Sequence, residues 1–310
     1  MTLAIAGATI LTPGGPVENG VLLTDGPAIA AAGFRDAVTV PAGARWIDAG
    51  GLLLAPGLID LQVNGGYGHD FTSEPDSVWD VGRRLVEHGV TAFLPTIISS
   101  PADRIERAQA VLAVGQPAGY RGAAPLGLHL EGPFLNAGAA GAHDPRWLRQ
   151  PDRALAAGWS PATGVRMVTL APELDGALGL VRELSERGVV VAAGHSTASY
   201  EQGAAAIEAG VRYATHLLNA MPALDKRAPG LAAALLTDER VTVGIIPDGI
   251  HLHPAVVRLV ARLCGVPVVV AAIPGDRLDR PRVAMGVGLL PLQYVAVAAV
   301  ERQAERRMVR

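Results

Sequence analysis

The 310-residue chain has few groups for covalent crosslinks or long-range electrostatic attraction. Cys264 is its only cysteine, which excludes an intramolecular disulfide framework and is typical of a reducing, cytoplasmic compartment. Lys226 is its only lysine, and the formal net charge is -3. The chain therefore offers no general attraction for nucleic acid or an anionic membrane. We expect neither partner, whereas a small anion bound by local charge remains possible.

The sequence also lacks segments typical of export or membrane insertion. Residues 1–7 carry no positively charged side chain and are soon followed by Pro13-Gly14-Gly15, a pattern that indicates a strand and a turn rather than a secretory signal. Residues 283–300 carry no charge, but two glycines, a proline and a glutamine interrupt them. This interrupted run does not favour a membrane helix.

The composition predicts a large buried core, because half of the residues are hydrophobic and only 18% are charged. Residues 1–53 contain short apolar runs between glycine and proline turns, such as Val21-Leu22-Leu23 and Ala37-Val38-Thr39-Val40, and predict a small β-domain. In residues 54–273, apolar runs alternate with helix-like segments. This alternation predicts an α/β domain with a parallel sheet. Residues 274–310 form a tail of different character.

The number of apolar runs favours a (β/α)8 barrel of the TIM type, since eight strands close such a barrel. The predicted strands are Leu58–Asn64, Val90–Thr96, Pro125–Glu131, Val165–Ala171, Val189–His195, Val211–His216, Val241–Asp248 and Val266–Ala272. The predicted helices include Val78–His88, Ala102–Val114, Leu174–Arg187, Tyr200–Ala209 and Pro254–Leu263.

Polar side chains stand at the carboxyl ends of several predicted strands, where a barrel of this type places its catalytic groups. They are Gln62, Asn64, Glu131, His195, His216 and Asp248. Any one of them alone has a simpler explanation, as a turn cap or a buried histidine with a satisfied hydrogen bond. Their repeated occurrence at this position indicates a site.

Three of these residues have the chemistry of metal ligands. Glu131 ends one strand and shares its face with His129, and His195 and His216 each follow a buried run. One carboxylate and two imidazoles suit Zn²⁺ or Fe²⁺ and leave a coordination position for water. We therefore predict a metal-ion site.

The segment Asp248-Gly249-Ile250-His251 follows the seventh predicted strand and offers further polar groups to the same end of the barrel. A simpler reading is a helix entry, in which Asp248 satisfies backbone donors and the histidine is solvated. Arg227, next to Lys226, is likewise most often a solvated surface charge.

Five sequence strings resemble the N-acetylglucosamine-6-phosphate deacetylase family of metal-dependent amidohydrolases, and the resemblance covers roughly residues 1–270. The two most specific are His129-Leu130-Glu131-Gly132-Pro133 and Thr215-His216-Leu217-Leu218-Asn219-Ala220-Met221. The others are Ala55-Pro56-Gly57-Leu58-Ile59-Asp60, Gly194-His195-Ser196 and Asp248-Gly249-Ile250-His251.

The resemblance implies a cytoplasmic enzyme of amino-sugar catabolism that releases acetate from N-acetylglucosamine 6-phosphate. It implies that Glu131, His195 and His216 hold one divalent ion, Zn or Fe. It also implies a substrate site of Ala142, His143, Asn219, Ala220, Arg227, Asp248 and His251. In a family homodimer, the arginine and a histidine matching His143 come from the neighbouring subunit, where the arginine binds phosphate.

Two departures from the wider amidohydrolase pattern bear on mechanism. Gln62-Val63-Asn64 stands where most amidohydrolases carry His-x-His, which agrees with one metal ion and disfavours a hydrolase of cyclic amides. The family's strand-eight aspartate, which activates water and protonates the leaving amine, has no counterpart near Ala272 and Ile273. The alternative is therefore a catalytically impaired metal- and sugar-phosphate-binding derivative, or a truncated or frame-disturbed product, unless Asp276 takes the role.

Overall fold

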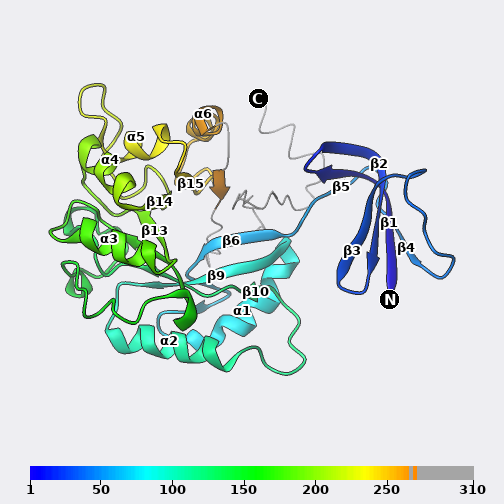
Figure 1. The fold of residues 1–310 in the computed structure, drawn as a ribbon, viewed down its shortest axis with the longest axis horizontal. Helices are drawn as coiled ribbons and strands as arrows, with labels where there is room; N and C mark the ends of the chain where they lie inside the picture. The colour runs from blue at the N-terminus through cyan, green and yellow to red at the C-terminus, as the bar shows by residue number, and fades with distance from the viewer. Residues whose placement is uncertain (265–267, 271–310) are drawn as a thin grey trace.

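The computed structural model describes residues 1–264 and 268–270, which form two large β-sheets, a small two-stranded sheet of β7 (Gly65–Gly66) and β8 (His69–Asp70), and the helices between the strands (Figure 1). The predicted tail 274–310 and the strand-eight positions 271–273 lie outside the described residues.

The first sheet contains the amino-terminal strands in the order β3-β2-β1-β4. Its strands are β1 (Thr2–Thr12), β2 (Gly15–Asp25), β3 (Ala28–Phe34), β4 (Arg45–Asp48) and β5 (Leu53–Leu54). β1 pairs with β2 antiparallel and with β4 and β5 parallel. Alternating burial along β1 places Ala4 and Ala6 in a small core with Val21 and Leu23, as expected for a sheet with one covered face.

The expectation of a strand at residues 37–40 is wrong. No strand lies between the end of β3 at Phe34 and the start of β4 at Arg45. Val38 is nevertheless buried in the core of the small sheet. The apolar run therefore reflects burial of one side chain rather than strand pairing, two outcomes that a short run does not distinguish.

The second sheet is parallel and curled, with helices on its outer side (Figure 1). Its main strands follow chain order, with β6 and the short β10 (Ala124–Pro125) both pairing with β9. They are β6 (Leu58–Val63), β9 (Val90–Ile98), β11 (Leu128–Glu131), β12 (Val165–Leu170), β13 (Val190–Ala193), β14 (Val211–Ala214), β15 (Thr242–Ile245) and β16 (Val268–Val270). All eight predicted strands have a counterpart here, which confirms the α/β class.

The main helices also follow the sequence prediction, with some changes at their ends. They are α1 (Val78–Leu85), α2 (Ala102–Val114), α3 (Ala177–Glu186), α4 (Tyr200–Ala209), α5 (Gly230–Thr237) and α6 (Pro254–Cys264). α1 ends three residues before the predicted His88, because the chain tightens into a 3-10 turn over Val86–His88. The sequence analysis missed α5, whose six buried residues give it no clear polar face.

A continuous core between the parallel sheet and its helices fixes the strand ends in space. It includes Leu130 on β11, Val168 on β12, Val191 on β13 and Leu231 on α5, all fully buried. Because the strands are parallel, their carboxyl ends meet on one side of the sheet. Polar residues that follow different strands are therefore brought together there.

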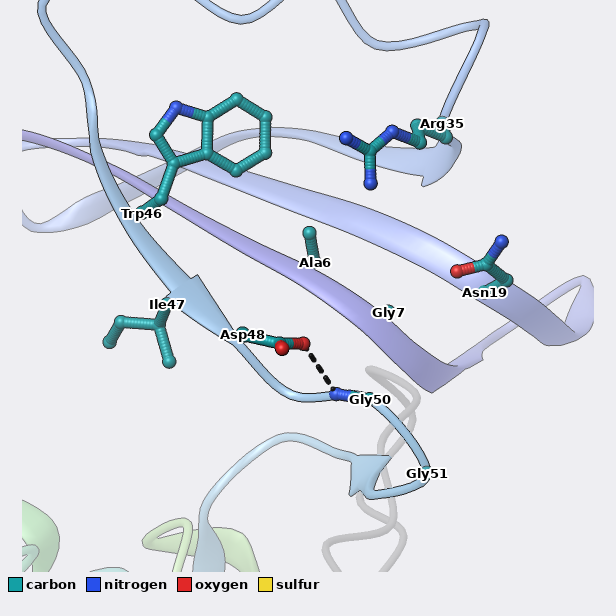
Figure 2. A pocket seen from close by; sticks show the side chains of 9 residues that line it. All are labelled: Ala6, Gly7, Asn19, Arg35, Trp46, Ile47, Asp48, Gly50 and Gly51. Carbon is teal, nitrogen blue, oxygen red and sulfur yellow. Dashed lines mark hydrogen bonds between the residues drawn. The ribbon is translucent and has the colours of Figure 1, made fainter.

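An open cavity of about 620 Å³ lies on the small sheet (Figure 2). Arg35 and Trp46 line it, with the guanidinium 5.8 Å from the indole centroid, and the Gly50 amide donates to Asp48 Oδ1 over 3.0 Å. None of the predicted site residues lines this cavity.

Within residues 1–264 and 268–270, no helix has both the length and the apolar character needed to cross a membrane.

Candidate metal centre

Glu131, His195 and His216 converge at the carboxyl ends of β11, β13 and β14. Glu131 Oε1 lies 3.2 Å from His195 Nε2 and 3.0 Å from His216 Nε2, and the two Nε2 atoms are 3.0 Å apart. All three side chains are buried. The structure thus brings together the three residues that the sequence predicted as ligands.

Both histidines stand two residues beyond a strand and adopt the left-handed backbone region, with φ of 47° at His195 and 31° at His216. Non-glycine residues rarely occupy this region, and strained positions of this kind cluster at functional sites. Here the sharp turn after each buried strand points the imidazole across the sheet end toward Glu131.

The hydrogen bond on the far side of the His195 ring determines which nitrogen faces the cluster. The Ala139 carbonyl lies 2.9 Å from His195 Nδ1 and can only accept, so Nδ1 carries the proton. The Nε2 lone pair is therefore available to a cation, the arrangement usual for a metal-binding histidine. His216 Nδ1 has no hydrogen-bond partner among the described residues.

The donor set fits a divalent cation. Ligand atoms about 2.1 Å from a tetrahedral metal ion lie about 3.4 Å from one another, a few tenths of an ångström more than the 3.0–3.2 Å separations found here. Two neutral imidazoles whose lone pairs face each other would repel unless a proton or a cation lay between them.

The charges within the cluster favour a bound cation as well. Burial raises the pKa of Glu131, but hydrogen bonds from His143, His195 and His216 outweigh it and hold the pKa well below its usual value. Burial lowers the pKa of His195, but the Glu131 carboxylate accepts a hydrogen bond from Nε2–H of the protonated ring, which outweighs burial and raises the pKa. The carboxylate is thus ionised, and a positive charge beside it is stabilised.

Gln62 and His143 complete the buried surroundings of Glu131. Gln62 Nε2 donates to Glu131 Oε1 over 2.8 Å, and His143 Nε2 lies 3.6 Å from Oε2. The backbone N–H of Ser99 donates to His143 Nδ1 over 3.2 Å, so the neutral His143 ring carries its proton on Nε2, facing the site. The expectation that this histidine comes from a neighbouring subunit is wrong, because His143 is buried against Glu131 of its own chain.

His129, two residues before Glu131, has a structural role. Its Nδ1–H donates to the Leu61 carbonyl over 3.1 Å, and its Nε2 accepts from the Thr169 hydroxyl over 2.7 Å. Burial lowers its pKa to about 4, so the ring is neutral. Thr215 extends this network through a 2.7 Å contact with Thr169. His129 therefore supports β11 below the cluster, in agreement with the interpretation of a buried histidine with satisfied hydrogen bonds.

Asp248 and His251 form a second polar pair, on the segment after β15. Asp248 Oδ1 accepts from the backbone amides of Ile250 and His251, and His251 Nδ1 donates to Oδ2 over 2.8 Å. These contacts are compatible with both interpretations of Asp248, as the residue that satisfies backbone donors at a helix entry and as part of a site. Its carboxylate fixes the His251 ring through Nδ1, and the imidazole is exposed.

The other predicted substrate residues lie on loops at the same ends of the strands. Asn219 donates from Nδ2 to the His216 carbonyl over 3.1 Å, and the Ala220 carbonyl accepts from the Ser196 amide over 3.1 Å. Both residues thus support the metal-ligand loops. Ala142 is exposed beside His143, and Arg227 is exposed on the segment before α5. No contact between Arg227 and the cluster exists among the described residues.

Two residues around the cluster escaped the sequence analysis. Ser99 follows β9 and contacts His143 through both its amide and its hydroxyl, the latter at 2.9 Å. Glu173 follows β12 and accepts hydrogen bonds from the loop that carries His195. Their position just after a predicted strand was the available signal, but a serine and a glutamate on a loop have no motif of their own.

The curled parallel sheet and the buried carboxylate–imidazole cluster define an α/β protein with a candidate divalent-metal centre. The model of the Amidohydrolase family matches residues 53–287. The chain belongs to the amidohydrolase family.

Within that family, the chain is similar to N-acetylglucosamine-6-phosphate deacetylases. The zebrafish (Danio rerio) enzyme is 38% identical over 269 residues, covering 81% of this chain and 66% of its own length. The human enzyme is 39% identical over 255 residues, covering 77% and 62%. This chain therefore spans slightly less than two thirds of either relative.

A solved structure of the Mycobacterium smegmatis N-acetyl-D-glucosamine-6-phosphate deacetylase, in complex with N-acetyl-D-glucosamine-6-phosphate, has a similar fold. Its TM-score is 0.79 at 35% sequence identity, and the match covers 87% of this chain and 70% of the other.

Proposed function

We propose that this chain deacetylates N-acetylglucosamine 6-phosphate to glucosamine 6-phosphate and acetate, in amino-sugar catabolism. The observation that carries the proposal is the convergence of Glu131, His195 and His216 within 3.2 Å of one another. The similarity to deacetylases and the sugar phosphate bound in the Mycobacterium smegmatis relative support the choice of substrate. They favour this function over a non-catalytic binding derivative.

In this proposal Glu131, His195 and His216 hold one divalent ion, Zn or Fe. Such an ion acidifies a bound water and polarises a carbonyl oxygen. Gln62 and Asn64 occupy the strand-one positions, and Gln62 donates its amide proton to Glu131. An amide in this place orients the carboxylate and is a weaker ligand than an imidazole, which supports one ion rather than two.

The chain's own side chains would bind and polarise the substrate. His143 presents Nε2–H into the site, because Ser99 occupies its Nδ1. His251 can polarise the acetamide carbonyl when doubly protonated, with Nδ1–H donated to Asp248 and Nε2–H directed to the carbonyl oxygen. In this arrangement Asp248 orients the His251 ring.

The remaining substrate contacts are assigned by resemblance. Ala142, Asn219 and Ala220 would contact the sugar through their loops, and Arg227 would bind the 6-phosphate with its guanidinium. Since Arg227 is exposed, it is free to reach the site of a second copy in a homodimer. A single cysteine supports a cytoplasmic location.

The parallel sheet supports a closed barrel rather than an open sheet. We propose that the eight strands close into a (β/α)8 barrel over residues 54–273, with residues 1–53 as a separate β-domain. β16 lies near β6, as closure between the last and first strands requires.

None of the described residues is assigned to proton transfer to the leaving amine. The family aspartate would lie near Ala272 or Ile273, outside the described residues. An impaired turnover is therefore compatible with an intact metal and sugar-phosphate site.

The proposal is tested by acetate release from N-acetylglucosamine 6-phosphate by chain loaded with Zn²⁺ or Fe²⁺. We expect turnover that disappears in His216→Ala and persists in His88→Ala, an exposed histidine away from the cluster. Absence of acetate release from folded, metal-loaded chain, even at high enzyme concentration, would contradict the proposed reaction.

A further inference from the structure

Glu173 lies on the loop after β12 and contacts the loops after two neighbouring strands. Its Oε2 accepts from Ser196 Oγ over 2.6 Å, and its Oε1 accepts from the Thr197 amide over 2.7 Å and from Asn136 Nδ2 over 2.9 Å. The carboxylate is thus surrounded by donors. None of these donors is a predicted metal or substrate residue.

One branch of this network leads directly to the backbone of His195. Ser196 and Thr197 immediately follow His195, whose left-handed φ of 47° is unfavourable for a residue with a side chain. Ser196 is fully buried, and its Oγ also accepts from the Ala198 amide over 3.1 Å. The carboxylate therefore fixes the turn that directs His195 at Glu131.

The other branch reaches the imidazole of His195. Asn136 donates its backbone N–H to the His195 carbonyl over 3.0 Å, and its Oδ1 accepts from the Gly138 amide over 2.8 Å. The second bond caps the 3-10 turn Ala137–Ala139. The Ala139 carbonyl of that turn accepts the Nδ1 proton of His195. The two branches meet at Glu173, and Asn136 Nδ2 also donates to Thr197 Oγ1 over 2.9 Å.

We propose that Glu173 is a positioning residue for the metal centre, which holds His195 through Asn136 on one side and Ser196 on the other. This inference rests on the proposed metal site. Partners outside the ligand shell orient metal-binding histidines, and their loss commonly weakens metal binding about 10- to 100-fold. The Glu173 carboxylate accepts hydrogen bonds from three residues, and a charged acceptor binds such donors more strongly than a neutral one.

The test measures the affinity of the purified chain for Zn²⁺ by chelator competition, and the visible spectrum of its Co²⁺ form. Glu173→Gln preserves the shape and removes the charge, and we expect about 10- to 100-fold weaker binding with an altered Co²⁺ spectrum. Glu186→Gln, at the exposed end of α3, is the matched control. It makes the same chemical change and should bind as the parent does.

Two further variants distinguish positioning from a general loss of folding. Ser196→Ala and Asn136→Ala each remove one branch and leave Glu173 in place. If Glu173 acts through both branches, each of these two variants should bind Zn²⁺ more weakly than the parent. The double variant Ser196→Ala and Glu173→Gln should then lose less Zn²⁺ affinity than the product of the two separate fold-losses. Thermal unfolding of the metal-free chains identifies any variant whose loss follows from unfolding.

The inference would be overturned if Glu173→Gln kept the Zn²⁺ affinity and the Co²⁺ spectrum of the parent, or if unfolding fully explained its weaker metal binding. Either result would leave the proposed function intact. A chain that binds metal through this network but releases no acetate would overturn the function alone. A parent chain that binds no metal would overturn both.

Discussion

Replacing Glu131 by glutamine is the most direct perturbation of the proposed metal centre. The substitution keeps the side-chain shape but removes the charge that faces both His195 and His216 at 3.0–3.2 Å. Structural zinc sites with four ligands bind with about 10–16 kcal/mol, or roughly 2.5–4 kcal/mol per ligand. Losing one of three protein ligands should therefore weaken binding about 10²- to 10³-fold.

This loss has a thermal consequence that is simple to measure. At a free metal concentration of 100 times Kd, binding stabilises the parent by about 2.7 kcal/mol. For a chain of this size, that raises Tm by about 4 °C. At the same concentration, a variant with a Kd about 10³-fold weaker gains less than about 0.1 kcal/mol. Added Zn²⁺ should then leave the Tm of Glu131→Gln nearly unchanged.

The assay is differential scanning fluorimetry with and without buffered Zn²⁺, together with elemental analysis of metal per chain. Glu106→Gln on α2 is exposed and removes the same charge, so it should keep the full metal-dependent rise in Tm. One bound metal per chain and a parent-like rise in Glu131→Gln would refute the assignment of Glu131 as a ligand.

Three further outcomes are expected. In calorimetry, N-acetylglucosamine 6-phosphate should bind more tightly than N-acetylglucosamine, and Arg227→Ala should remove the difference; equal affinities in the parent would contradict a phosphate site. Replacing residues 271–273 by Thr-Asp-Ala should raise acetate release about 10²- to 10⁴-fold, since that is what a positioned acid–base group contributes; robust turnover without any gain would show that another group has the role. Burial raises the pKa of Asp248, but hydrogen bonds from the backbone and side chain of His251 outweigh it, so the pKa is lowered from 3.8. A lowered carboxyl pKa adds stability that is present above the unfolded value and lost as pH falls through the folded value. The carboxyl ¹³C shift of Asp248 should therefore move only below about pH 4; a midpoint for that carboxyl clearly above the ordinary aspartate value would contradict this pair.

Most of the sheet could be predicted because local sequence carries its signal. Buried parallel strands are short apolar runs, and β12 and β14 begin at the predicted residues, Val165 and Val211. α2 and α4 have the predicted bounds, and α4 begins with a capping box between Ser199 and Gln202. The run at residues 37–40 misled the prediction, since burial of Val38 on the small core needs no strand.

The sequence by itself determined the candidate ligands, because parallel strands bring residues at their carboxyl ends to one side of the sheet. Glu131, His195 and His216 could be named on that rule, and their role as ligands remains a prediction. Tertiary structure decided the rest: it buried His143 beside Glu131 of its own chain, fixed the tautomers of His143 and His195 through Ser99 and Ala139, and connected Glu173 to the turn that carries His195. These contacts join residues 12 to 56 positions apart through irregular loops with left-handed turns, whose geometry depends on packing that no local periodicity encodes.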